Sequence, residues 1–417
     1  MESYAIIDVK TVRIIIHSSF KEQFESLNNK ERSYPLFGRI YDDFDVCHFS
    51  GILTCPSNAN LIGRISFGTN ELISFEHSFE YPYIHVIFES DTIEDLKVEI
   101  NNDEVSKQSE DDISIEFIDL NRLFIRIDEN ETPLTIVKDK KVAIIGMGSG
   151  GSLLALYLAK SGINNLVFID DDRLETHNII RHICDLNHLG RFKTRAVKEY
   201  LKNRFPEIII KSLERKFDIH TRADAEYYLD LFADVNLIIA ASGDHIVNFA
   251  LNDFIHSNNL QIPIIFAGTF DRVKGGLMFK VDPRKDDYCY HCIYSDSSND
   301  GNIQTGSVPS TSELEKKIVY DRSMQEQIAQ PGLGLDIDNL TILLSKFCLD
   351  LLLTGNEHGL YHFSHNFYMW FNRTIMSRDE SSVKFEGLEL YFYEDLEKNE
   401  KCPFHGPQLL KNKVKED

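Results

Sequence analysis

A glycine-rich turn between an apolar run and an amphipathic segment constrains the fold of this chain more than any other feature. The turn has the spacing G-x-G-x-x-G, and its glycines are Gly146, Gly148 and Gly151. Asp170 ends the next apolar run, about 20 residues further on, where a carboxylate can hold ribose hydroxyls. Glycines let the backbone approach a phosphate closely, and the start of the following helix offers free N–H groups. The pattern therefore predicts a strand–helix–strand unit that binds a nucleotide with a ribose.

Alternating strand-like and helical segments extend this unit through residues 138–417. The apolar runs that we expect to be strands are KVAII, LVFID, EIIIKSL, VNLIIAAS and IPIIFAG. The segments that we expect to be helices are GGSLLALYLAKSG, FKTRAVKEYLKNRF and NLTILLSKFCLDLLLTG. Apolar strands that alternate with helices are typical of parallel sheets covered on both faces. We therefore expect an α/β fold with a doubly wound, Rossmann-like, mostly parallel sheet. The polar stretch 294–330 predicts a mobile crossover loop.

Residues 1–137 differ from the rest of the chain and carry no motif with evident chemistry. Strand-like runs recur in this block, namely VRIIIHSS, YIHVIFES, LKVEI, ISIEFIDL and LFIRI. Its histidines do not have the spacing of a metal site, and they are His17, His48, His77 and His85. We interpret 1–137 as a β-rich (α+β) N-terminal accessory or recognition domain. A linker at 128–134 joins it to the second domain, which begins at residue 138.

Composition argues against several classes of function. The formal net charge of −22 repels phosphate backbones, so we expect no nucleic-acid partner. No apolar run reaches the ~20 residues needed to span a bilayer, and the first residues do not resemble a signal peptide. The seven cysteines are too few and too scattered for a disulfide framework. These features predict a soluble cytoplasmic protein without a membrane partner.

The segment after Asp170 collects side chains that a hydride-transfer site does not need. It holds Asp172, Asn178, Arg181 and Lys193 within a short stretch. Attack on the α-phosphate of a nucleoside triphosphate builds negative charge, which Arg and Lys neutralise while Mg2+ held by a carboxylate bridges the phosphates. The segment therefore favours a nucleoside triphosphate with Mg2+ over a redox dinucleotide.

Two short ligand pairs lie far apart in the sequence. The first is C-x-x-C at Cys289 and Cys292, and the second is C-x-x-H at Cys402 and His405. Two ligands separated by two residues can chelate one ion from a turn, and a second pair completes a tetrahedron. Because sulfur and imidazole ligands suit Zn2+, we predict a structural zinc site that the C-terminal strands of 356–417 complete. Redox chemistry at the first pair is the alternative.

Taken in order, these motifs resemble the superfamily of ubiquitin-activating enzymes, which includes bacterial enzymes that adenylate sulfur-carrier proteins or the microcin C peptide. Its pattern is GxGxxG, Asp-x-Asp, Asn-x-x-Arg and Gly-x-x-Lys, and the residues here are Gly146, Gly148, Gly151, Asp170, Asp172, Asn178, Arg181, Gly190 and Lys193. The resemblance implies that Asp170 binds the ribose. It implies that Asn178, Arg181 and Lys193 contact the phosphates. The resemblance also implies a Mg2+-binding aspartate after the fourth strand, and Asp244 is the residue at that place.

The resemblance covers residues 138–290 well and implies a reaction. We predict ATP- and Mg2+-dependent adenylation of the C-terminal carboxylate of a ubiquitin-like protein, a sulfur-carrier protein or a peptide, with release of pyrophosphate. The catalytic residues would be Arg181, Lys193 and Asp244, and the superfamily implies a homodimer. A variant of this reaction adds thioester transfer to a cysteine, either Cys184 or a thiol of a partner. The same motifs are also compatible with an NAD-dependent oxidoreductase and with a non-catalytic nucleotide-binding scaffold.

Overall fold

The chain divides into two compact units, Met1–Arg126 and Ile127–Asp417, which are described separately. The computed structural model describes residues 12–27, 34–41, 46–54, 59–67, 83–88, 96–102, 105–107, 113–117, 120–127, 134–286, 288–294, 319–322, 325–328, 332–353, 360–376, 382–393 and 396–407. The second unit includes α2 (Leu134–Lys138), whose Leu134 and Val137 are buried. The division therefore lies ahead of the predicted boundary at residue 137.

The first unit is built on an eight-stranded sheet with the order β7-β6-β5-β4-β2-β3-β1-β8. Its elements are β1 (Val12–Ile16), α1 (Ser18–Glu25), β2 (Tyr34–Tyr41), β3 (Val46–Gly51), β4 (Asn60–Phe67), β5 (Tyr83–Phe88), β6 (Leu96–Asn102), β7 (Val105–Lys107) and β8 (Ile113–Phe117). The helix α1 buries Phe20 and Phe24 in a core that also contains Ile14 and Phe49. The unit is β-rich, as the sequence predicts.

One predicted strand of this unit is wrong. The run LFIRI begins at Leu123, and a 3-10 helix, η3 (Leu120–Phe124), covers its start before a turn follows. Leu123 and Ile125 are 45% and 69% exposed. Their apolar side chains therefore join no core, and the segment ends the first unit instead of adding a strand to its sheet.

The second unit is built on another eight-stranded sheet, with the order β11-β10-β9-β12-β13-β14-β17-β20. Its strands are β9 (Lys141–Ile145), β10 (Asn165–Ile169), β11 (Ile209–Leu213), β12 (Leu237–Ala240), β13 (Ile264–Thr269), β14 (Gly275–Val281), β17 (Phe367–Phe371) and β20 (Glu389–Tyr393). Neighbouring strands from β11 to β13 pair in parallel. The pairs β13–β14, β14–β17 and β17–β20 are antiparallel. All five apolar runs that predict strands in this unit form strands of the parallel part.

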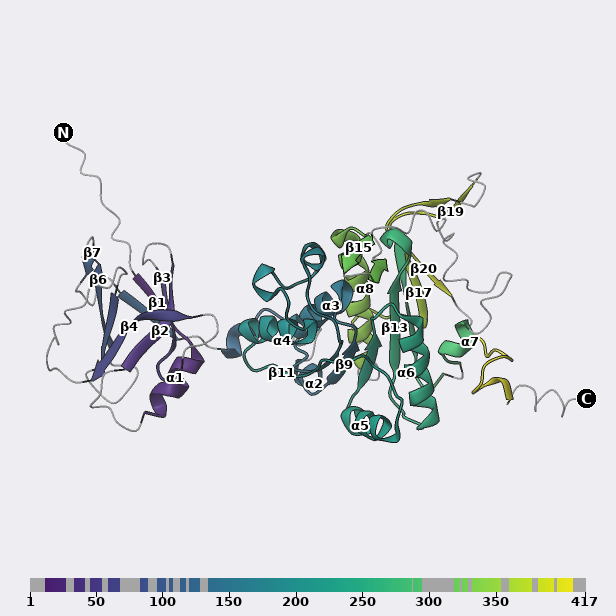
Figure 1. The fold of residues 1–417 in the computed structure, drawn as a ribbon, viewed down its shortest axis with the longest axis horizontal. Coiled ribbons are helices and arrows are strands. Elements are labelled where there is room, and N and C mark those ends of the chain that lie inside the picture. Colours follow the sequence, from purple (N-terminus) through teal and green to yellow (C-terminus); the bar gives the residue numbers. More distant parts are fainter. Residues whose placement is uncertain are drawn as a thin grey trace, which may run out of the picture. The chain divides into compact units, whose positions relative to one another are not determined.

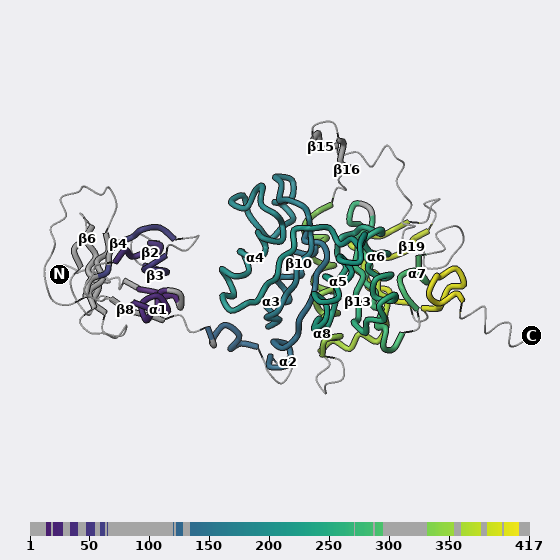
Figure 2. Tube along the Cα trace, turned by 60° about the horizontal axis from the view of Figure 1, so that its bottom comes forward, coloured from purple at the N-terminus to yellow at the C-terminus, as the bar shows by residue number. Residues whose placement is uncertain are grey.

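Helices cover both faces of this sheet, and Figures 1 and 2 show their course. They are α3 (Ser149–Lys160), α4 (Lys193–Arg204), α5 (Arg222–Phe232), α6 (His245–Ser257) and α8 (Gly334–Leu353). Leu158, Val197 and Phe347, from α3, α4 and α8, share one buried cluster. Tyr228 and Phe254, from α5 and α6, belong to the other. The predicted α/β class with a doubly wound, mostly parallel sheet is therefore confirmed.

Local signals in the sequence set the ends of these helices. The helix α3 stops before Gly162, which has φ of +95°, a conformation that only glycine adopts at little cost. Thr221 and Asp224 form a capping box at the start of α5, and the side chain of Asp244 caps α6. Because α6 follows β12, its cap holds Asp244 at the carboxyl edge of the sheet.

Most of the predicted crossover loop, residues 294–330, lies outside the described residues. Within it, β15 (Val319–Arg322) and β16 (Gln325–Ile328) form an antiparallel pair. The remaining short elements are α7 (Tyr290–Tyr294), β18 (Ile375–Met376) and β19 (Val383–Phe385). Throughout the described ranges, no helix combines the length and the apolar character needed to cross a membrane.

Candidate nucleotide site and metal centre

A cavity of about 350 Å3 opens at the carboxyl ends of β9, β10 and β12. The strand β9 lies between β10 and β12, so the strand order reverses at this point. Such a switch point is where doubly wound sheets bind their ligands. The side chains and glycines that line it include Gly146, Gly148, Asp170, Asp171, Asp172, Lys193, Lys216, Ser242 and Asp244. Of the predicted nucleotide-site residues, only Gly151, Asn178 and Arg181 are absent from the lining.

The three glycines of the turn have different structural tasks. Gly146 has φ of +99°, and a Cβ built on it would lie 2.7 Å from the Cα of Ser242. A Cβ built on Gly151 would lie 1.8 Å from the carbonyl oxygen of Gly146. A Cβ on Gly148, which begins α3, would meet no atom within 4 Å. Gly146 and Gly151 therefore permit close backbone packing, whereas Gly148 keeps open space at the helix start.

Asp170 is held by backbone groups of two loops. Its Oδ2 accepts a hydrogen bond of 2.6 Å from the Met147 backbone N–H, and its Oδ1 accepts one of 2.8 Å from that of Asp172. Burial raises the pKa of Asp170, although the Lys193 charge and these two N–H groups act in the opposite direction. The carboxylate is thus fixed beside the glycine turn, at the place where the sequence predicts a ribose contact.

Lys193 forms an ion pair inside the cavity. Its Nζ lies 2.7 Å from Oδ2 of Asp172, and its backbone N–H donates to the Asp172 carbonyl at 2.9 Å. The lysine is buried, whereas Asp172 is exposed. A buried ammonium that begins α4 is therefore held in contact with the cavity by one carboxylate.

Asp244 stands across the cavity in a second ion pair, with Lys216. Its Oδ1 accepts from the Ile246 N–H at 2.8 Å, and its Oδ2 lies 2.9 Å from Lys216 Nζ. Burial works against ionisation of Asp244, but the hydrogen bonds from Lys216 and from the start of α6 outweigh it and lower the pKa. Lys216 belongs to none of the sequence motifs. It comes three residues after the end of β11, and this place after a predicted strand is the signal that could have identified it.

Asn178 and Arg181 lie outside the cavity. The Asn178 Oδ1 accepts from the Glu175 N–H at 2.9 Å, which caps the 3-10 helix η4 (Thr176–Arg181). Arg181 lies against the chain that enters α8, because a Cβ built on Gly332 would be 3.7 Å from its Nη1. Asn178 thus shapes the segment that carries Arg181, and the predicted contacts of both residues with phosphates stay predictions.

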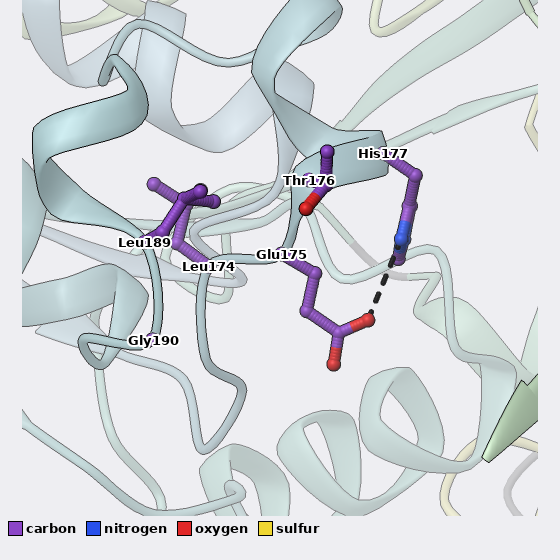
Figure 3. A pocket seen from close by; sticks show the side chains of 6 residues that line it. All are labelled: Leu174, Glu175, Thr176, His177, Leu189 and Gly190. Atoms are coloured by element: carbon purple, nitrogen blue, oxygen red, sulfur yellow. Dashed lines mark ion pairs between the residues drawn. The ribbon is translucent and has the colours of Figure 1, made fainter.

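A second, shallow pocket of about 590 Å3 lies beside this segment. Figure 3 shows the residues that line it, namely Leu174, Glu175, Thr176, His177, Leu189 and Gly190. His177 Nδ1 lies 3.4 Å from Oε2 of Glu175. Burial lowers the pKa of His177, and the charges of Arg181 and Lys193 lower it further. His177 therefore lies within electrostatic reach of both predicted catalytic cations.

A buried histidine ties the glycine turn to the next loop. His182 Nε2 lies 3.0 Å from the Met147 carbonyl oxygen, and its Nδ1 accepts from the Cys184 N–H at 3.1 Å. Nε2 therefore carries the proton that is donated to Met147. Burial lowers the pKa of His182 to about 4, so the ring is neutral near pH 7.

Cys184, the candidate thioester thiol, is part of the core. It is 2% exposed, and burial raises the pKa of its thiol to about 12. A thiolate is the nucleophile in thioester formation, so this conformation offers no reactive thiol at Cys184.

The four predicted metal ligands come together although they are far apart in sequence. Cys289 immediately precedes α7 and Cys292 lies within it. Cys402 and His405 come from the C-terminal turn, which lies beside α7 in both views of the chain (Figures 1 and 2). Their ligand atoms all lie within 4.8 Å of one another. His291 points elsewhere, since its Nε2 is 2.7 Å from Oδ1 of Asp253.

The separations within this cluster are those of a tetrahedral site. The distance from Cys289 Sγ to Cys402 Sγ is 3.6 Å, and Nδ1 of His405 lies 3.3 Å from Cys292 Sγ and 3.5 Å from Cys402 Sγ. With Zn–S of about 2.3 Å and Zn–N of about 2.0 Å, tetrahedral ligand atoms lie roughly 3.5–3.8 Å apart. The neighbouring sulfurs raise the pKa of Cys289. A bound cation would offset the charges of neighbouring thiolates and so allow these thiols to ionise together.

The comparison with known families identifies the group to which the chain belongs. The profile of the ThiF family matches residues 120–382, which include the whole nucleotide cavity. The chain belongs to the ThiF family. The predicted resemblance to the superfamily of ubiquitin-activating-enzyme-like adenylating enzymes is therefore confirmed.

Curated relatives of this ThiF-family chain match only part of it. It is 28% identical over 172 residues to the sulfur carrier protein ThiS adenylyltransferase of Escherichia coli, which covers 41% of this chain and 64% of that protein. It is 24% identical over 165 residues to the SAMP-activating enzyme E1 of Haloferax volcanii, covering 39% and 56%. A match to the uncharacterized protein y4qC of Sinorhizobium fredii has 24% identity over 227 residues and covers 53% and 38%. The chain thus spans less than two thirds of the length of these relatives.

Among solved structures, the chain matches E. coli MccB with ATP at a TM-score of 0.43 and 17% identity. The alignment covers 65% of this chain and 68% of that chain. PaaA gives a TM-score of 0.42 and 18% identity, covering 68% and 78%.

Proposed function

We propose that this ThiF-family member catalyses ATP- and Mg2+-dependent adenylation of the C-terminal carboxylate of a ubiquitin-like protein, a sulfur-carrier protein or a peptide, releasing pyrophosphate. The observation that carries the proposal is the cavity at the switch point of the sheet, where Asp170, Lys193 and Asp244 meet beside the glycine turn. Relatives named as adenylyltransferases and as an activating enzyme support the same reaction class.

The charges of the cavity support a requirement for a divalent cation. The lining contains four carboxylates and two ammonium groups, a formal charge of −2. The triphosphate of ATP is strongly negative, so it cannot enter such a lining without a further cation. Mg2+ bound at Asp244 would supply that charge and polarise the phosphoryl oxygens.

The residues of the chain divide the remaining work. The first turn of α3 lies at the cavity edge behind Gly146 and Gly148, so its N–H groups and the helix dipole are suited to phosphate oxygens. Asp170 is positioned for the ribose hydroxyls. Lys193 neutralises the negative charge that grows as the α-phosphorus bonds to the substrate oxygen and the bond to the β-phosphate breaks. The attacking carboxylate is already ionised at neutral pH, so no general base is required.

We propose that the acyl-adenylate is the product that leaves the enzyme. None of the residues that line the cavity is a cysteine, and Cys184 is buried with a raised pKa. A thioester, where one forms, is then expected on the thiol of a partner.

We further propose that the Cys/His cluster binds one structural Zn2+, that the protein forms a homodimer as the superfamily implies, and that it acts in the cytoplasm. The zinc proposal is supported by three sulfurs and one imidazole at tetrahedral separations. Metal analysis of the purified protein should give about one Zn per chain, since four ligands make one site.

The test of the main proposal is ATP–pyrophosphate exchange with a panel of ubiquitin-like proteins, sulfur carriers and peptides. Lys193→Ala and Asp244→Ala should slow exchange by roughly 10²–10³-fold, as expected when a charge that stabilises the transition state is lost. Arg181→Ala shows whether that arginine acts from its place beside α8. Arg195→Ala is the matched control, because Arg195 also lies on α4 but pairs with Glu214 outside the cavity. Binding of NADH in place of ATP, or exchange that survives the Lys193 and Asp244 substitutions, contradicts the proposal.

A further inference from the structure

The ion pair between Lys216 and Asp244 has no place in the reaction described above. Both residues line the nucleotide cavity, and Lys216 Nζ lies 2.9 Å from Oδ2 of Asp244. The side chains are half-exposed, at 48% for Lys216 and 34% for Asp244. The pair is therefore accessible to ligands that enter the cavity.

The backbone leaves Asp244 with one carboxylate oxygen for a cation. Its Oδ1 is engaged in the cap of α6 through the Ile246 N–H, and its own N–H donates to Ser242 Oγ at 3.2 Å. The carboxylate is thus fixed in orientation, with Oδ2 toward Lys216. A divalent cation that binds Oδ2 would lie close to the ammonium of Lys216, and the repulsion between the two positive charges favours displacement of the flexible lysine side chain.

Lysine is suited to such a displacement. Its ammonium is a compact charge on a flexible four-carbon stem. A half-exposed ion pair contributes little free energy, so breaking the pair between Lys216 and Asp244 costs little. Lys216 also interacts electrostatically with Asp171 and Asp218. In a cavity with an excess of carboxylates, a triphosphate is the partner that a displaced ammonium would gain.

We propose that Lys216 competes with the divalent cation for Oδ2 of Asp244 and pairs with the phosphates of the nucleotide once the cation displaces it. This inference rests on the proposed function, since it assigns Lys216 to the same ATP site. Lys216 thereby makes metal binding at Asp244 depend on the nucleotide: a cation alone has to expel the ammonium, whereas a cation that arrives with ATP gives the ammonium a new partner.

The first measurement uses Mn2+ and the full-length protein without nucleotide. Lys216→Gln should bind Mn2+ roughly two- to fivefold more tightly than the wild type, the range expected for loss of a half-exposed ion pair. Lys216→Arg keeps the charge and should resemble the wild type. Asp244→Asn should lose the Mn2+ site, which shows that the ion measured is the one at Asp244. Mn2+ affinity that is unchanged or weaker in Lys216→Gln overturns the proposal.

The second measurement is the affinity for ATP with Mg2+ present, by calorimetry without an acyl substrate. Lys216→Gln should bind ATP about two- to fivefold more weakly, so the two ligands shift in opposite directions. Arg222→Gln is the matched control, because it removes one positive charge from an exposed pair with Glu226 on α5, outside the cavity. Equal ATP affinity in Lys216→Gln and the wild type overturns the phosphate contact.

The two proposals fail in different ways. If the wild type does not bind ATP, the proposed function fails, and the Mn2+ comparison, which contains no nucleotide, still decides whether Lys216 competes at Asp244. If ATP binds and exchange occurs but Lys216→Gln changes neither affinity, only the role of Lys216 is refuted.

Discussion

The nucleotide cavity and the Cys/His cluster hold their charged groups in opposite ways. In the cavity, each key side chain has a partner within the protein: Asp170 has backbone N–H groups, Asp172 has Lys193 and Asp244 has Lys216. In the cluster, the ligand atoms mainly face one another, and Cys289 and Cys402 are almost fully buried.

This difference distinguishes a site from which a nucleotide can exchange from a site at which a metal ion would stay bound. In the cavity, Asp170, Asp172 and Asp244 have hydrogen-bond or ion-pair partners without a ligand, so we expect ATP to bind and leave at little cost to the fold. The cluster has no comparable internal balance, and the proposed Zn2+ would keep its buried sulfurs together. We therefore expect loss of the ion to lower the free energy of unfolding. Loss of a charged side chain in the cavity should instead weaken ATP binding or slow the reaction.

The largest effect should come from removing a ligand of the cluster. Cys289→Ser is expected to lower the free energy of unfolding by several kcal/mol, because a structural zinc ion contributes roughly 10–16 kcal/mol of binding free energy in small domains. Chemical denaturation together with metal analysis measures both consequences. His291→Ala is the control within the same C-x-x-C segment, since His291 pairs with Asp253, and it should keep its metal. A Cys289→Ser protein as stable as the wild type would refute the structural role.

Two substitutions in the glycine turn should distinguish its role in folding from its role in ATP binding. Gly151→Ala forces a Cβ against the Gly146 carbonyl oxygen and should cost about 1–3 kcal/mol, the usual cost of overpacking. Gly148→Ala meets no protein atom within 4 Å and should leave thermal stability unchanged while weakening ATP binding, because the added methyl group stands at the phosphate end of the cavity. Equal loss of stability in both variants contradicts this division of tasks.

A smaller effect, on the free energy of unfolding, should appear at His182 as pH falls. The pKa of His182 is about 4 in the folded protein and 6.5 in the unfolded chain, so below pH 6.5 the unfolded chain takes up a proton that the folded protein does not. The stabilising contribution of neutral His182 is complete above pH 6.5 and is lost progressively down to pH 4, at about 1.4 kcal/mol per pH unit. Unfolding free energies of wild type and His182→Gln, measured from pH 7 to 5, should converge. A constant difference across this range would show that the ring is not held neutral.

The smallest effect is expected at Cys184. Because its thiol is buried with a pKa raised to about 12, Cys184→Ala should change the rate of ATP–pyrophosphate exchange by no more than about twofold. Its cost in stability should resemble that of other small core truncations, roughly 1 kcal/mol. A variant that folds normally but forms no transferable acyl product would instead favour a thioester on Cys184.

Short-range patterns in the sequence predicted most of the second unit. Apolar runs predicted the five parallel strands, and the C-x-x-C and C-x-x-H spacings predicted four residues whose side chains lie together in the folded chain. These predictions succeed because strand periodicity and chelating turns are local, and because carboxyl ends of parallel strands share one edge. The run LFIRI shows the limit of such patterns, since its start forms a 3-10 helix and Leu123 and Ile125 are exposed.

Partnerships across loops were not predictable from the sequence. Lys216 belongs to no motif, and β10 and β9 lie between the strands that precede it and Asp244, so only the folded course of the loop after β11 brings the two side chains together. Asn178 fits the superfamily pattern, yet its side chain caps η4 outside the cavity. Arg181, three positions later, lies by α8. Their spacing follows the superfamily pattern, but the direction of each side chain depends on packing against elements distant in sequence.

The Cys/His cluster also has a consequence for the connectivity of the molecule. Its two ligand pairs lie on either side of the long segment that contains α8, β17 and β20. With the ion bound, the backbone between Cys292 and Cys402 is closed into a ring by coordinate bonds. A protease that cut this ring once would leave two fragments that are still linked through the bound ion. A chelator would be needed to break that link. The ion would thus do for this part of the chain what a disulfide does for a secreted protein.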